Sequence, residues 1–134
     1  MKKAKIFLTL AAFLVVVWFV FNPIGYFGVN SFGFTVYNSL PLPIMDFQVR
    51  ADGKMRVVSK THDLMLDDVG WLLADNPAML IVSIGWQNVV IPRREWIGLK
   101  GVDVQFLQTG EAIERFNELK RTGKRVAIHL HSTC

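Results

Sequence analysis

VDVQFLQTGEAIERFNELKRTGKRVAIHLH, at residues 102–131, is the stretch that decides the fold class. Apolar residues alternate over 102–107, which predicts a strand. Over 109–121 an apolar stripe recurs at helical spacing, which predicts an amphipathic helix; its members are Ala112, Ile113, Phe116 and Leu119. Residues 125–131 predict a further strand. A strand–helix–strand unit of this length predicts neighbouring parallel strands joined by a right-handed crossover.

The predicted helix has recognisable end signals. Thr109 is a candidate N-cap, and Glu111 in the first turn favours the positive end of the helix dipole. Gly123 is a suitable residue for ending the helix. The helix is therefore expected to occupy the interval between Thr109 and Gly123.

Upstream segments extend this unit. The continuous apolar run 78–84 predicts a strand that is buried on both faces. Short helical segments are expected after Asp67-Asp68 and over 92–99, and a short strand over 33–37. Asp52-Gly53 separates two alternating runs, 45–50 and 54–59, which predicts a hairpin. The sequence therefore predicts a three-layer α/β domain with a largely parallel mixed sheet and an N-terminal hairpin.

The N-terminal segment has a different composition. Residues 6–21 are apolar apart from Thr9, and three lysines precede them: Lys2, Lys3 and Lys5. The small residues of an A-x-A-like cleavage site are missing after this run, so an uncleaved membrane anchor is favoured over a cleaved signal peptide. We expect an anchor over residues 1–26 and one domain over 27–134. The lysines predict a cytoplasmic N-terminus and an extracytoplasmic domain in a single-pass topology.

The net charge of +4 gives little information about the domain. Three of the 15 Lys+Arg residues lie in the N-terminal segment, which has no acidic residue. The remaining part of the chain therefore contains 12 basic and 11 acidic residues. A nearly neutral domain has no electrostatic footprint for nucleic acid.

The C-terminal residues contain a linked series of motifs: Thr109-Gly110-Glu111-Ala112, Phe116-Asn117-Glu118-Leu119, Gly123-Lys124-Arg125-Val126 and His131-Ser132-Thr133-Cys134. With Asp46, His62 and Gly85 upstream, this series resembles the Mth938-like family, which contains mitochondrial complex I assembly factor three and the adipogenesis-associated domain protein. The resemblance covers about residues 27–134. It implies an α/β fold, no established enzymatic activity, and roles in assembly or protein interaction.

Two positions depart from the family pattern. Trp86 stands where the family tends to have a second glycine after the buried strand, so a close backbone approach by a ligand is not expected there. His129 stands where a small or apolar residue is expected. The N-terminal anchor is also atypical of a family that is better known from soluble proteins.

Several polar residues could in principle form a site. His129 and His131 project from one face of the last predicted strand and could share a metal ion, completed by His62 or Cys134. Cys134 and His131 could pair as nucleophile and base, although no orienting partner is evident in the sequence. Asp46 is expected to be buried and hydrogen-bonded. We therefore predict no catalytic residue, no metal ligand and no cofactor.

Tryptophan and arginine gather near the end of the apolar run. Both residue types anchor protein interfaces, and the candidate contact surface comprises Trp86, Arg93, Arg94 and Trp96. The favoured function is a membrane-tethered protein-interaction or assembly module that binds a protein partner or forms a homo-oligomer. The alternative is a small-ligand- or metal-dependent enzyme that uses His62, His129 and His131.

Overall fold

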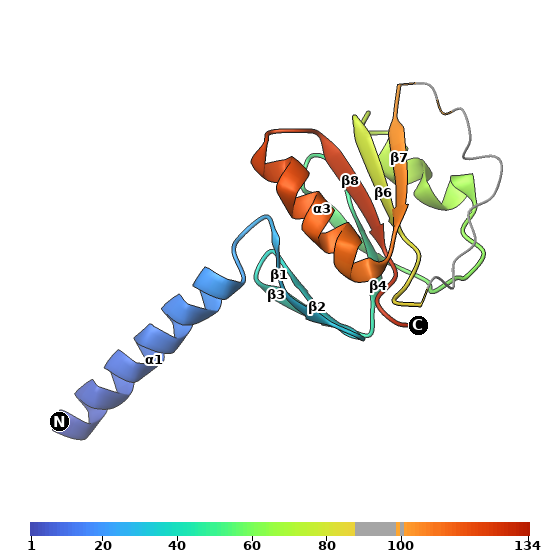
Figure 1. Cartoon of the computed structure of the whole chain (residues 1–134). Coiled ribbons are helices and arrows are strands. Elements are labelled where there is room, and N and C mark those ends of the chain that lie inside the picture. The colour runs from blue at the N-terminus through green and yellow to red at the C-terminus, as the bar shows by residue number, and fades with distance from the viewer. Residues whose placement is uncertain (88–98, 100) are drawn as a thin grey trace.

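The computed structural model describes residues 1–87, 99 and 101–134. Its first element is α1 (Lys2–Phe21), which projects away from the folded domain (Figure 1). No residue of α1 is buried. The predicted helical turn over 92–99 falls almost entirely outside the described residues.

A five-stranded mixed sheet forms the centre of the domain. Its strands are β4 (Asp46–Val49), β5 (Met55–Val58), β6 (Met79–Ser83), β7 (Asp103–Leu107) and β8 (Val126–Leu130), in the spatial order β5-β4-β8-β6-β7. β6 pairs in parallel with both β7 and β8, whereas β4 pairs antiparallel with β5 and β8. The predicted α/β class, mixed sheet and hairpin are confirmed, with the parallel pairing confined to β8, β6 and β7.

Helical elements cover both faces of this sheet. The long helix α3 (Thr109–Arg121) packs on one face, against Ile128 and Leu130 of β8. The short elements η1 (Leu66–Val69) and α2 (Gly70–Leu73) pack on the other face, against Ala127. Because side chains alternate along a strand, His129 of β8 and His131, which directly follows β8, lie on the same face as Ala127. This places both histidines on the η1 and α2 side of the sheet.

The two ends of α3 differ in their agreement with the sequence. Thr109 is not the N-cap as predicted, because it is the first helical residue and Gln108 precedes it without a side-chain cap. The Thr109 hydroxyl instead bonds to Ser83 and to the carbonyl of His131. The C-terminal prediction is confirmed: Gly123 has φ +79° and donates its N–H to Lys120, as expected of a glycine that ends a helix.

A second, three-stranded antiparallel sheet lies next to α3 and the end of α1. Its strands are β1 (Phe27–Ser31), β2 (Phe34–Tyr37) and β3 (Leu40–Pro43). Only β2 was predicted. β3 contains two prolines, and it accommodates them because it is an edge strand of this sheet. Phe27 and Tyr37 contact Phe116 of α3 in edge-to-face geometry, so an aromatic cluster joins the small sheet to the helix.

A tight joint connects α1 to the small sheet. Asn22, at the C-cap of α1, is 1% exposed, and its Oδ1 accepts the N–H of Val29. Trp18 of α1 donates its indole N–H to the carbonyl of Ser39 at 3.2 Å. Gly28 lies so close to Asn22 that a Cβ at this position would be 2.7 Å from the Asn22 Cα. The helix therefore continues into the domain through a packed connection.

Candidate functional site

The candidate site is centred on a buried pair, Asp46 and His131. Asp46 begins β4, and His131 follows the last residue of β8. In the antiparallel register Gln48 faces His129, so Asp46 and His131 become neighbours two positions further along the same face. The Nδ1 atom of His131 is 2.5 Å from Oδ2 of Asp46, and both side chains are fully buried.

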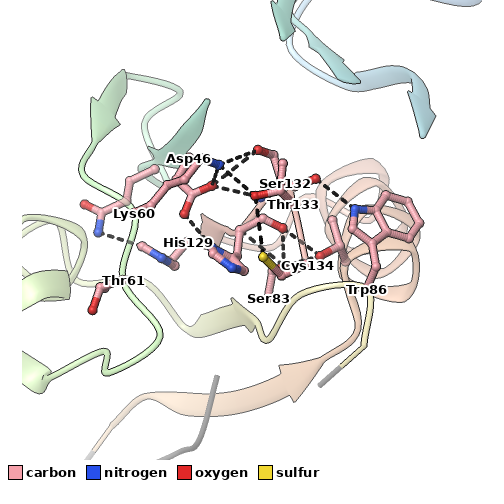
Figure 2. Close-up of polar contacts among 12 residues, drawn as sticks. Asp46, Lys60, Thr61, Ser83, Trp86, His129, Ser132, Thr133 and Cys134 are labelled. Atoms are coloured by element: carbon pink, nitrogen blue, oxygen red, sulfur yellow. Dashed lines mark hydrogen bonds and ion pairs between the residues drawn. The ribbon is translucent and has the colours of Figure 1, made fainter. Parts of the chain in front are cut away.

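The second carboxylate oxygen of Asp46 accepts several hydrogen bonds (Figure 2). Its Oδ1 atom accepts the Ser132 N–H at 2.9 Å and the Lys60 ammonium at 3.0 Å. Burial alone would raise the pKa of Asp46, but the hydrogen bonds from His131, Ser132 and Lys60 lower that pKa to about 2. Asp46 is therefore an anion throughout the physiological pH range.

The other ring nitrogen of His131 is in a different situation. Its Nε2 atom is buried and has no hydrogen-bond partner among the residues that the structure describes. The ring of His62 packs against the ring of His131 in an edge-to-face arrangement, with 5.2 Å between the two ring centroids. His62, His131 and Cys134 each offer a ligand atom, and these three atoms lie within 4.8 Å of one another. These side chains could hold a metal ion.

Further contacts fix the segment that contains His131 and Cys134. The Ser83 and Thr109 hydroxyls are 2.7 Å apart, and Thr109 donates to the carbonyl of His131. Trp86 donates its indole N–H to the carbonyl of Ser132 at 2.9 Å (Figure 2). The backbone N–H of Gln87 donates to the carbonyl of Cys134. Hydrogen bonds therefore hold residues 131–134 against the end of β6, the residues that follow it and the start of α3.

His129 belongs to a separate polar chain on the same face. Its Nδ1 atom is 3.0 Å from Nε2 of the Gln48 side chain. The Oε1 atom of the same side chain accepts a hydrogen bond from Arg56. Burial lowers the pKa of His129 to about 4, so its imidazole is neutral at physiological pH. These residues line an open cavity of about 590 Å³ that is rimmed by Asp67 and Asp68. His129 therefore does not belong to the cluster of potential metal ligands formed by His62, His131 and Cys134.

The remaining predicted positions have structural contacts or fall outside the described residues. Asn117 of α3 bonds to both main-chain groups of Phe27, each at 2.9 Å, and so joins α3 to β1. Gly85 is buried at φ +89°, and its carbonyl accepts the N–H of Thr109. Trp86 of the predicted contact surface lies at the site, half-buried. The other members of that surface, Arg93, Arg94 and Trp96, lie outside the described residues.

Sequence reasoning missed how the site is assembled. Cys134 and His131 lacked an evident orienting partner, yet Asp46 orients His131 from 85 residues away. Lys60 was not singled out, although its ammonium contacts Asp46 and the hydroxyl of Thr133. Pairing of β4 with β8 places Asp46 beside His131, and pairing of β4 with β5 brings Lys60 near Asp46. A single sequence gives no signal for the register of β4 against β8.

Solved structures of the same architecture exist, although no model of a known protein family matches the chain. The protein MT938 is 26% identical, covers 81% of this chain and 98% of its own, and superimposes with a TM-score of 0.68. A Bordetella pertussis protein described as a Mth938-like domain is 16% identical over 80% of this chain and 85% of its own, with a TM-score of 0.55. A protein described as an outer membrane protein from Bartonella henselae is 18% identical over 85% of this chain and 99% of its own, with a TM-score of 0.70.

These comparisons and the strand order define the class of protein: a mixed α/β domain with the Mth938-like fold, preceded by a long apolar helix. The resemblance to the Mth938-like family, predicted from the C-terminal motifs, is confirmed. The fold by itself assigns no reaction to the chain, because function depends on the site and its chemistry.

Proposed function

We propose that this chain is a membrane-tethered protein-interaction domain. The observation that supports the tether is α1, a 20-residue helix with a mean hydropathy of 2.4 in its most apolar window and no buried residue. Twenty residues at about 1.5 Å per residue span about 30 Å, which matches the hydrocarbon core of a bilayer. It is the one helix with this length and composition in the described part of the chain.

The proposed topology has the N-terminus in the cytoplasm and the domain on the other side of the membrane. The lysines before residue 6 support this orientation through the positive-inside rule. A protein of the same fold is described as an outer membrane protein, which is compatible with a domain outside the cytoplasm. The test is labelling of intact cells with a membrane-impermeant thiol reagent, using Cys134→Ser chains with one new cysteine.

In this labelling test Glu114→Cys, on the exposed face of α3, is expected to react in cells whose cytoplasmic membrane is intact. Ala4→Cys is the matched control and is expected to react only after that membrane is opened. The reverse pattern would contradict the proposed topology.

A protein-binding surface is supported by exposed apolar side chains at the tip of the small sheet. Phe32, Ile44 and Met45 are 60%, 67% and 40% exposed. The backbone bond from Ile44 to the carbonyl of Gly33 brings the two turns of this tip together. Exposed apolar clusters of this kind mark interaction sites. A partner in the same membrane, which the tether would keep close to this tip, is the proposed occupant.

Site-specific photo-crosslinking in cells tests this surface. A photoreactive residue at Phe32 is expected to give one discrete adduct with another membrane protein. The matched control is Val57 on β5, which is apolar and 55% exposed but lies in the other sheet, and it is expected to give none. An adduct of twice the chain mass would show a homo-oligomer instead, and equal adducts at both positions would contradict a specific surface.

A further inference from the structure

We propose that His62, His131 and Cys134 form a binding site for a divalent transition-metal ion, with Zn²⁺ as the best match. The three side chains come from the loop after β5, the end of β8 and the segment that follows β8. Their potential ligand atoms already lie within 4.8 Å of one another. Two imidazole nitrogens and one thiolate form a donor set that favours zinc over magnesium or calcium.

His131 provides the independent observation that points to a ligand. Its side chain is fully buried, and its Nε2 atom has no hydrogen-bond partner in the described part of the chain. Buried polar atoms are almost always paired, so an orphaned imidazole nitrogen requires an explanation. A ring nitrogen of His131 lies within 4.8 Å of the potential ligand atoms of His62 and Cys134, so two further metal ligands are close to this imidazole.

Asp46 completes the arrangement behind His131. Metal-binding histidines usually donate their other ring N–H to a carboxylate, which fixes the ring and increases its basicity. The contact of 2.5 Å between His131 Nδ1 and Asp46 Oδ2 provides this support. Asp46 is in turn fixed by Ser132 and Lys60. Nε2 is therefore the only ring nitrogen of His131 that remains for the metal.

The geometry needs only a small adjustment. Zinc lies about 2.0–2.3 Å from nitrogen and sulfur ligands in a tetrahedron, so neighbouring ligand atoms are roughly 3.5 Å apart. His131 is fixed, whereas His62 is exposed and Cys134 is partly exposed, so these two side chains can close the remaining distance. A cavity of about 340 Å³ borders His62 and Cys134 and leaves room for a water molecule as the fourth ligand.

The charges near the site are compatible with a cation. Lys60 also borders this cavity, but its ammonium pairs with Asp46 and contacts the hydroxyls of Ser132 and Thr133. Asp46 therefore balances the positive charge of Lys60. Metal binding would deprotonate the Cys134 thiol, and the thiolate would neutralise part of the charge of the ion.

The test uses the untagged full-length chain in detergent, stripped of metal and titrated with Zn²⁺ and with Co²⁺ as a spectroscopic probe. We expect one ion per chain, with a thiolate-to-cobalt charge-transfer band and the visible bands of tetrahedral cobalt. Cys134→Ser should abolish the charge-transfer band. His62→Gln should weaken zinc binding by more than the roughly 10–100-fold that loss of an outer-shell partner costs. The control His129→Gln, on the same strand and face, should bind zinc like the parent chain.

A second readout remains informative if Asp46 or His131 variants fail to fold. Zinc should protect Cys134 of the parent chain from alkylation by iodoacetamide, and it should not do so in His62→Gln. Unchanged zinc affinity in both Cys134→Ser and His62→Gln would overturn the site. Failure of stoichiometric zinc binding, with alkylation unaffected by zinc, would also overturn it and would leave an ordered water as the partner of His131 Nε2. Neither result depends on the membrane topology or on a protein partner.

Discussion

At the residue scale, His129 shows how burial determines a protonation state. It is 2% exposed beside Gln48, with Asp46, His131, Asp68 and Arg56 as its charged or titratable neighbours, and burial lowers its pKa from 6.5 to about 4. Below about pH 6.5 the unfolded chain therefore binds a proton that the folded domain binds only near pH 4. The free energy of unfolding should fall across this window by roughly 3 kcal/mol because of this one group.

Urea unfolding of the parent chain and of His129→Gln, measured at pH 7 and pH 4.5, checks this expectation. The stability loss between the two pH values should be smaller in the variant by most of that amount. Equal losses in both chains would show that His129 does not titrate as its burial requires.

Asp46 gives a dependence of the same sign at lower pH, because its pKa is also lower in the folded domain than in the unfolded chain. Its folded pKa of about 2 lies below the ordinary value of 3.8, so its contribution to stability is present above about pH 4 and is lost as the pH falls toward 2. Asp46→Asn removes the negative charge that pairs with Lys60 and accepts the hydrogen bond of His131, and it should destabilise the domain by about 3 kcal/mol at pH 7. Asp103→Asn, an exposed acid on β7, should change stability by less than about 0.5 kcal/mol. Equal effects in thermal unfolding would refute the role of the buried pair.

The sequence identified most residues of the site as family-matched positions, but it did not show their grouping. His62, His131 and Asp46 were each singled out from the pattern, whereas their proximity depends on the antiparallel pairing of β4 with β8. His129 and His131 share a face as the strand period requires, yet the depth of burial and the neighbour Gln48 separate their environments. Such differences arise from tertiary packing, which a residue pattern does not encode.

At the scale of elements, the joint between α1 and β1 depends on the absence of a side chain at Gly28. A methyl group there would lie 2.7 Å from both the Asn22 Cα and the Phe21 carbonyl oxygen. Because these are backbone atoms, Gly28→Ala should force the end of α1 away from β1. Limited proteolysis between Pro23 and Tyr26 should become several-fold faster in this variant.

Gly70→Ala is the matched control for that substitution. Gly70 has φ −54°, and a Cβ added there would meet no atom within 4 Å. This change should leave proteolysis at the joint unaltered and keep stability within about 1 kcal/mol of the parent or slightly above it. Faster cleavage in both variants would indicate a general loss of stability and not an opened joint.

The predictability of each element follows its periodicity. α3 and the strands β6, β7 and β8 were predicted because their apolar patterns extend over several residues. β1 and β3 were not predicted, since β1 alternates weakly and β3 contains Pro41 and Pro43. These two strands are stabilised by pairing with β2 and by the aromatic cluster around Phe116, and neither contribution is local in sequence.

At the scale of the whole molecule, the domain should fold without α1. Deletion of residues 2–21 removes no buried side chain, so the shortened chain should keep its fold and move from the membrane fraction to the soluble fraction. Fractionation and circular dichroism measure these two outcomes. A shortened chain that remains in the membrane fraction would locate membrane attachment elsewhere, and an unfolded one would show that the contact from Trp18 to Ser39 stabilises the domain.

The central position of β8 has a consequence for the order of events during synthesis. β8 lies between β4 and β6, although the other strands of this sheet precede it in the chain. Until residues 126–130 have left the ribosome, the hairpin β4–β5 and the pair β6–β7 have no common neighbour and cannot form one sheet. α1 is made more than 100 residues earlier. Under the topology that we propose, the apolar helix would therefore reach the membrane while the domain is still unfolded.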